Sequence, residues 1–423
     1  MSFGLPSGLA PDVVRTYRSH RAAECWSMLG GGFLQLAEAV LRRSLGAGDL
    51  AVTLFTMAPL APNLLGGFWG LWMEGKAKRP IILVSGVVRY LVLVALVVSR
   101  QPVWFIAVWT VAALMEPCFL TAQSSLFQSN YPVAVRGTLV SRVGAIGRLT
   151  FLAGAIVGGA VLDAWPAWGT WVLAVGGLVG FFGTVVYAAI PFTNPRGRAA
   201  DSGPALAAAG RMVGDMGRIL RENPAFGRYE RNYMVYGLAF MLLLPVNVFL
   251  LIDTFRLTYK EFSLIKLVAV QLGFMLSVST WGRAMDRRGP YGTAALAFLV
   301  LAAYPGLLSL GVWLHSSACV WVGFFVFGIC MAGVHMTWTL SSVTFARGRD
   351  STPFMGIHIF CVGVRGVLGP LIGWRLYQLA GYHAAFGVSA VLFLTAGLLM
   401  AFAPDREAVE SWTEEPVVRA IAP

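Results

Sequence analysis

The chain has 423 residues, of which 57% are hydrophobic and only 12% are charged, and its mean hydropathy is +0.71. A soluble globular protein carries roughly 25% charged residues, so the composition excludes that class. The net charge of +12 does not indicate a nucleic-acid ligand, because the basic residues are placed in loops between apolar stretches. Since about 20 apolar residues span a bilayer as a helix, the sequence predicts a polytopic membrane protein.

The apolar stretches form two groups of six. The first predicted spans cover residues 22–41, 50–73, 80–99, 102–127, 138–162 and 168–191. After one long polar interval, the later spans cover residues 230–252, 261–283, 291–313, 317–343, 354–378 and 382–403. We therefore expect an all-α membrane protein of 12 transmembrane helices, with an N-terminal bundle over 1–192, a linker over 193–228, a C-terminal bundle over 229–404 and a tail over 405–423.

The linker begins with glycine, proline and serine, and its second part carries a helical stripe of apolar residues at Met212, Met216, Ile219 and Leu220. This spacing predicts an amphipathic helix lying on the membrane surface. Most basic residues fall in loops on the same side as the linker. The positive-inside rule places that side, and both termini, in the cytoplasm, and we expect a bacterial cytoplasmic membrane as the location.

Two polar segments, "GLWMEGKAKR" and "WGRAMDRRGP", share a pattern in which a glycine precedes a carboxylate by four residues and basic residues follow. The first copy supplies Gly70, Glu74, Lys78 and Arg79, and the second supplies Gly282, Asp286, Arg287 and Gly289. The two carboxylates are 212 residues apart, about half the chain. This spacing predicts a duplicated architecture. The alternative is that the charges only anchor loops at the inner surface.

Two six-helix halves, a long loop between them and this motif after the second span of each half resemble the major facilitator superfamily. In that family the motif is a cytoplasmic latch between the halves, although Glu74 replaces the usual aspartate here. A second internal repeat, "GAIVGG" and "GPLIGW", supplies Gly154, Gly158, Gly159, Gly369, Pro370 and Gly373. It resembles the glycine–proline motif of exporters in the family, with Ala155 in place of the proline, and small residues at this spacing also allow close helix packing.

Polar residues inside predicted spans are the candidate site, because an ionisable group at mid-bilayer costs about 2.5–3.5 kcal/mol. They are Gln35, Glu38, Glu116, Gln123, Arg148, Asn247, His335, His358 and Arg365, together with Tyr236 on an aromatic stripe. Glu38 or Glu116 could carry a coupling proton or form a fixed ion pair. Arg148 and Arg365 could clamp an anionic substrate or neutralise those carboxylates. The histidines and the aromatic stripe could equally be packing residues.

These features predict a secondary transporter with alternating access that couples protons to a small organic or amphipathic solute, with export favoured over import. One alternative is uptake or exchange of an organic anion held by Arg148 and Arg365. Another is a transport-inactive assembly factor or a membrane enzyme on the same fold. The chain shows no catalytic or nucleotide-binding motif, so we expect no enzyme activity, no cofactor and no metal, and the expected partners are the solute, protons and the lipid bilayer.

Overall fold

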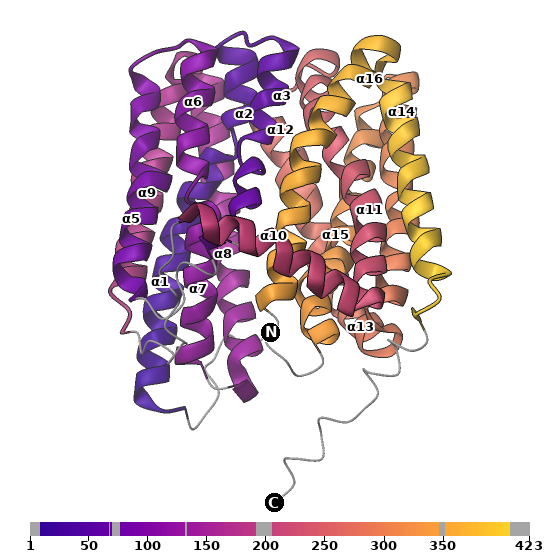
Figure 1. Cartoon of the computed structure of the whole chain (residues 1–423). Helices are drawn as coiled ribbons and strands as arrows, with labels where there is room; N and C mark the ends of the chain where they lie inside the picture. The colour runs from indigo at the N-terminus through magenta and orange to yellow at the C-terminus, as the bar shows by residue number, and fades with distance from the viewer. Residues whose placement is uncertain are drawn as a thin grey trace, which may run out of the picture. The chain divides into compact units, whose positions relative to one another are not determined.

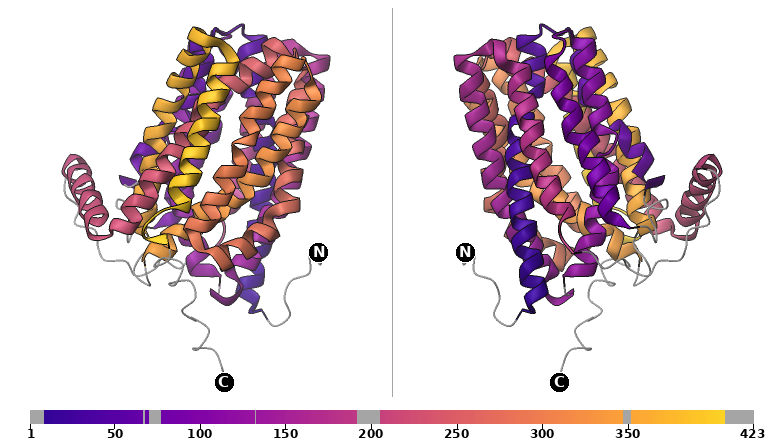
Figure 2. Two further views of the ribbon diagram at one scale, coloured as in Figure 1. Left: turned by 90° about the vertical axis from the view of Figure 1, so that its right-hand side faces the viewer. Right: turned by 90° about the vertical axis from the view of Figure 1, so that its left-hand side faces the viewer.

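The computed structural model describes residues 9–66, 68–69, 77–131, 133–191, 205–346 and 352–406. These residues are almost entirely helical, and none of them lies in a strand. The chain divides into two compact units (Figures 1 and 2). Unit 1 contains Met1–Gly203 and Arg256–Leu264, and unit 2 contains Pro204–Phe255 and Ile265–Pro423.

Unit 1 is a helical bundle in which α1 packs against α8 and α9. Its elements are α1 (Pro11–Leu34), α2 (Ala37–Ala39), η1 (Val40–Ser44), α3 (Asp49–Met57), η2 (Ala61–Leu65), α5 (Lys78–Tyr90), η3 (Leu91–Val97), α6 (Pro102–Ala113), α7 (Glu116–Asn130), α8 (Val133–Ala164), η4 (Pro166–Trp168), α9 (Gly169–Ala188) and α12 (Tyr259–Ser263). Helix α5 also packs against α9.

Unit 2 begins with α10. Its elements are α10 (Ala205–Glu222), α11 (Pro224–Phe249), η5 (Leu250–Thr254), η6 (Leu264–Ala269), α13 (Val270–Leu301), α14 (Ala303–Leu314), α15 (Ser317–Ala346) and α16 (Thr352–Ala401). Helix α11 packs along α16, and α13 packs along α15. Gly289 and Gly381 have non-helical backbone angles and divide α13 and α16, so each of these elements is two consecutive helices.

The helices have the length and surface of membrane spans. Within the described residues, nine helical segments are long and apolar enough to cross a membrane, and Asp49–Leu65 is a shorter apolar one. Large apolar side chains are exposed on them, including Val103 at 77% and Leu276 at 74%. In lipid such exposure carries no hydrophobic penalty, since the tails are as apolar as the side chains. The prediction of an all-α membrane protein is confirmed.

The duplication predicted from the sequence has a counterpart in local geometry. The first span of unit 1 ends in a π-helical segment at Val40–Ser44, and α11 of unit 2 ends in one at Leu250–Thr254. Each is followed by a residue with positive φ, Gly46 at 64° and Arg256 at 49°. The starts of the two π-helical segments, Val40 and Leu250, are 210 residues apart, and so are Gly46 and Arg256. Such π-helical turns are rare, so their recurrence at half-chain spacing supports two copies of one ancestral unit.

Glycines set the closest helix contacts in both units. A Cβ built on Gly154 of α8 would lie 2.3 Å from the backbone oxygen of Leu29 in α1. A Cβ on Gly373 of α16 would lie 1.8 Å from the backbone oxygen of Leu242 in α11. Without a side chain at these points, the backbones approach closely and gain dispersion contacts, which drive helix association in lipid. The two copies of the predicted helix-packing motif therefore lie at α1–α8 and α11–α16 contacts.

Gly289 ends the first half of α13 with φ 60° and ψ −172°, a conformation that is essentially restricted to glycine. We expect Gly289→Ala to destabilise the protein by about 1–3 kcal/mol. Gly282→Ala, seven residues earlier, is the matched control, because a Cβ there meets no atom within 4 Å. Apparent melting temperatures from tryptophan fluorescence in detergent measure both, and equal stability of the two variants would contradict the expectation.

Candidate functional site

A cluster of ionisable side chains lies inside unit 2, between α11 and α16. Glu230 and His358 are 3% and 2% exposed, and Nδ1 of His358 lies 3.0 and 3.1 Å from the two carboxylate oxygens of Glu230. A carboxylate can only accept, so Nδ1 carries the hydrogen in this contact. Burial of such groups is tolerated only when they are paired and hydrogen-bonded, and this pairing joins the two helices.

Arg365 completes this buried polar cluster, which we define as Glu230, Tyr233, His358 and Arg365. Arg365 is 3% exposed, its Nη1 donates to the backbone oxygen of Tyr233 at 3.1 Å, and its guanidinium lies over the Tyr233 ring at 5.3 Å from the centroid. The side chain fits because Gly237 leaves room for it: a Cβ there would come within 2.2 Å of Cδ of Arg365. The cluster therefore contains one anion, one permanent cation and one imidazole.

Two nitrogens of the cluster have no hydrogen-bond partner within the described residues. These are Nε2 of His358 and Nε of Arg365. Leaving a buried donor or acceptor unsatisfied costs about 1–3 kcal/mol, so such atoms persist mainly where a water, ion or ligand visits them. With the ring hydrogen on Nδ1, Nε2 of His358 can bind a proton or accept a hydrogen bond, whereas Nε of Arg365 can only donate one. The rings of Tyr233 and Trp338 pack edge-on against His358.

Unit 1 holds a second group of charges, Glu24, Arg89, Glu116 and Arg148, on four different helices. Nε of Arg89 in α5 forms an ion pair with Oε2 of Glu116 at the start of α7. Glu24 of α1 interacts electrostatically with both Arg89 and Arg148. The two carboxylates and the two guanidiniums balance in charge, which lowers the cost of placing them in a membrane. Glu116 therefore contacts Arg89, while the neighbouring carboxylate of Arg148 is Glu24.

Four of the other predicted site residues, Gln35, Glu38, Gln123 and His335, are not members of these two clusters. Gln35 and Glu38 are partly buried just after α1 of unit 1, and Gln123 donates to the Tyr187 hydroxyl at 2.9 Å. In unit 2, His335 is exposed and contacts Phe274 edge-on, with 5.8 Å between the ring centroids.

The predicted aromatic stripe of α11 is packed inside unit 2. Tyr236 is 3% exposed and stacks on Phe298, with 4.2 Å between the ring centroids. Asn247, about three turns further along α11, is 6% exposed, and its Oδ1 accepts no hydrogen bond from the described residues. The stripe therefore contributes packing along α11, with one unsatisfied amide oxygen near its end.

The predicted gate motif is described in part. Gly70 and Glu74 lie outside the described residues, and α5 begins at Lys78 with Arg79 exposed. In the second copy Gly282 lies inside α13, Arg287 is exposed and Gly289 forms the break in the helix, whereas the side chain of Asp286 is outside the description. The backbone conformation of Gly289 thus explains by itself why the motif ends in a glycine. The role of the motif as a latch stays a prediction.

Glu230 was missed by the sequence analysis, although a signal was present. It lies three residues before Tyr233, and Tyr233 and Tyr236 lie on the aromatic stripe of α11. Extending that stripe by one turn reaches Glu230, because residues at i and i+3 share a helix face. It is the first residue of the predicted span 230–252, and the packing of α16 over it buries the carboxyl group.

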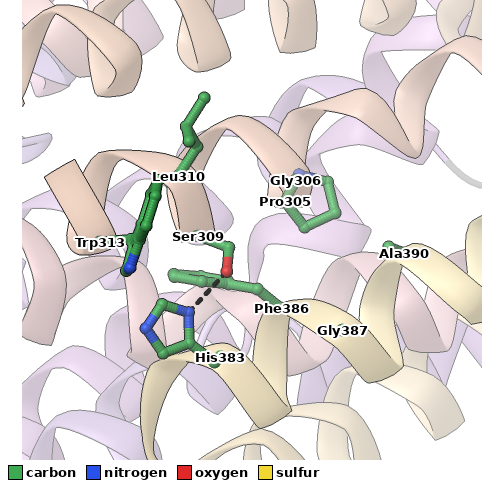
Figure 3. A pocket seen from close by; sticks show the side chains of 9 residues that line it. All are labelled: Pro305, Gly306, Ser309, Leu310, Trp313, His383, Phe386, Gly387 and Ala390. Atoms are coloured by element: carbon green, nitrogen blue, oxygen red, sulfur yellow. Dashed lines mark hydrogen bonds between the residues drawn. The ribbon is translucent and has the colours of Figure 1, made fainter.

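Unit 2 also carries an apolar groove of about 590 Å³ between α14 and the second half of α16 (Figure 3). Ser309 and His383 share a hydrogen bond of 2.7 Å across it, and Trp313 and Phe386 form its walls (Figure 3). Trp313 is 71% exposed, which fits an amphipathic ring at a membrane interface. No aspartate, glutamate, lysine or arginine is among the described residues that line this groove.

Two helical units, duplicated local geometry and charges held inside apolar bundles define a polytopic membrane carrier. The family model for the Major Facilitator Superfamily matches residues 25–352 and 233–423. The chain belongs to this superfamily and is a secondary transporter that moves a small solute across a membrane. No curated protein sequence matches the chain significantly.

Solved structures agree with this assignment. A mutant of the nucleoside transporter NupG has a TM-score of 0.67 and 12% identity, covering 94% of this chain and 99% of its own. The human organic anion transporter MFSD10 (TETRAN) has a TM-score of 0.62 and 16% identity, covering 93% of this chain and 100% of its own. A structure from the proton dependent oligopeptide transporters has a TM-score of 0.65 and 15% identity, and the match covers 95% of this chain and 99% of that chain. At such identities the likeness shows the fold alone.

Proposed function

We propose that this secondary transporter is coupled to protons and that Glu230 and His358 carry the coupling proton. The observation that supports the proposal is the direct contact between a carboxylate and an imidazole that are both almost completely buried. Imidazole is the side chain whose ordinary titration lies nearest physiological pH. A proton bound there changes the net charge of the cluster from zero to +1, because Arg365 already balances Glu230.

The proton affinity of the pair can depend on the conformation of the transporter, because Glu230 is on α11 and His358 is on α16. If α11 shifts against α16 during transport, the contact lengthens and His358 loses the carboxylate that stabilises its protonated form. Affinity for the proton would thus be high in one arrangement and low in the other. Differential affinity of this kind is what lets an ion drive a conformational change.

For the solute we propose a small organic or amphipathic molecule, moved outward. Similarity of the segment around Gly154–Gly159 to the exporter motif supports the direction. The proteins of similar fold are transporters of nucleosides, organic anions and oligopeptides, and all three are small organic solutes. We place the organic-anion alternative second, because the guanidinium of Arg365 is 3% exposed and is bound within unit 2.

Reconstitution into proteoliposomes with an imposed pH gradient tests the function, with a panel of organic solutes outside and a pH dye inside. We expect solute-dependent proton movement in the wild type.

Glu38→Gln and Glu116→Gln are measured in the same assay. Because Glu116 is held in an ion pair with Arg89, we expect Glu116→Gln to retain proton movement. The variant should lower stability by about 1 kcal/mol or more, since Arg89 loses its ion pair and keeps only the electrostatic interaction with Glu24. Loss of proton movement in either variant would reassign the coupling group, and no proton movement with any solute would contradict proton coupling itself.

A further inference from the structure

A second groove in unit 2 lies where α11 begins and α16 ends. Its volume is about 300 Å³. Its lining residues are Arg228, Arg231, Asn232, Thr395, Leu398, Leu399, Phe402, Ala403 and Pro404. Asn232 fixes its floor: this side chain is 2% exposed and its Nδ2 donates to the backbone oxygen of Leu399 at 3.0 Å, which holds the two helices together.

The charge of the groove is set by two arginines and one aspartate. Arg228 is bound in a bidentate manner by Asp405, with Nε on Oδ2 and Nη2 on Oδ1 at 2.6 Å. Arg231 is one turn further along α11 and exposed, and no carboxylate within the described part of the chain forms an ion pair with it. Asp405 compensates the charge of Arg228, so the positive charge of Arg231 remains in the groove. It matches the single negative charge of a phosphodiester group.

Apolar surface continues from the arginines along α16. Phe402 is 81% exposed, Leu398 is 50% exposed and Leu394 is 45% exposed. Leu398 and Leu394 lie four and eight residues before Phe402, which places them about 6 and 12 Å deeper along the helix. These side chains therefore form a strip of hydrocarbon that starts beside the cationic rim and runs toward the centre of the span.

We propose that this groove is a binding site for an anionic phospholipid. Arg231, with Arg228 beside it, binds the headgroup phosphate at the rim, and the acyl chain lies along Leu398 and Leu394. A cation next to an exposed apolar strip fits an amphiphile better than free phosphate, which would gain nothing from the strip. The basic end of α11 also lies on the side that the loop charges assign to the cytoplasm, where basic residues attract anionic lipid.

The test is native mass spectrometry of the full-length protein in uncharged detergent, titrated with phosphatidylglycerol or with phosphatidylcholine of the same acyl chains. We expect the wild type to prefer phosphatidylglycerol. Arg231→Gln should weaken phosphatidylglycerol binding about fivefold. It should weaken phosphatidylcholine binding less, because the choline cation of that lipid already neutralises its phosphate. Asp405→Asn should strengthen phosphatidylglycerol binding by a similar factor, because it releases Arg228.

Arg283→Gln is the matched control, since this exposed arginine of unit 2 lies outside the groove. Melting temperatures in lipid-free detergent establish that each variant is folded. Equal phosphatidylglycerol affinity in the wild type and Arg231→Gln would overturn the proposal, as would an Asp405→Asn variant that binds less. Displacement of phosphatidylglycerol by millimolar inorganic phosphate would also overturn it, because a free anion would then be the occupant.

Discussion

Glu230→Gln is expected to abolish proton-driven accumulation of solute while leaving exchange of solute across the membrane intact. The amide keeps the volume of the carboxyl group and can still bond to His358, so α11 and α16 stay together. It carries no charge, however, and His358 beside Arg365 then loses the anion that stabilises its protonated form. The pair can no longer bind a proton in one arrangement and release it in the other.

The loss should be large. Without a coupling proton the pH gradient supplies no free energy to the solute, so we expect accumulation driven by a pH gradient to fall at least roughly tenfold, to the level seen without a gradient. Counterflow of labelled solute at equal pH measures exchange separately. His358→Gln should give the same separation of the two activities, because it removes the other half of the pair.

Glu222→Gln is the control for the loss of one carboxylate. Glu222 is exposed at the end of α10 and lies outside the cluster. We expect it to accumulate solute as the wild type does. Full gradient-driven accumulation in Glu230→Gln would show that the coupling proton is carried elsewhere, and Glu38→Gln would then be the next variant to measure.

Gly373→Ala is expected to destabilise unit 2 by about 3 kcal/mol or more. The new Cβ would lie 1.8 Å from the backbone oxygen of Leu242, 2.6 Å from its carbonyl carbon and 2.9 Å from its Cα. All three are backbone atoms of α11, so no side chain can rotate away and the helices themselves must separate. Overpacking of a close contact costs about 1–3 kcal/mol even where side chains adjust, and a backbone clash exceeds that range.

Gly387→Ala, fourteen residues later on the same element, is the matched control, because a Cβ there meets no atom within 4 Å. Apparent melting temperature and the fraction of monodisperse protein after purification measure both variants. We expect Gly387→Ala to match the wild type and Gly373→Ala to melt early or to aggregate. Similar melting of all three proteins would mean that α11 and α16 are further apart than described.

Much of the fold could be predicted from the sequence because spanning a bilayer demands length and hydrophobicity in each segment separately. The π-helical turns that begin at Val40 and Leu250 were not predicted, since their register depends on how the following loop packs. The close packing of Gly154 and Gly373 was anticipated as one of two interpretations of the glycine motif. The structure supplies the contacts with Leu29 and Leu242 that make a side chain at these positions too large.

The candidate site was predicted less completely. His358 and Arg365 were singled out as ionisable residues inside a span, and both lie in the buried cluster. The partners differ from those considered: Glu116 contacts Arg89, and His358 contacts Glu230. Spacing along one helix shows which residues share a face, but it does not show which other helix packs on that face.

The sequence by itself determined that the chain crosses a membrane many times, that one pattern repeats at half-chain spacing and that charged residues are placed inside apolar helices. These properties follow from the composition of each segment and from the repeated motif, and both can be read without knowing which segments pack together. The tertiary structure alone decided which charges meet and that Glu230 is buried. The reason is that an ion pair depends on the distance between helices, which small glycines and the packing of α11 on α16 set. The periodicity of one helix shows only which of its own residues share a face.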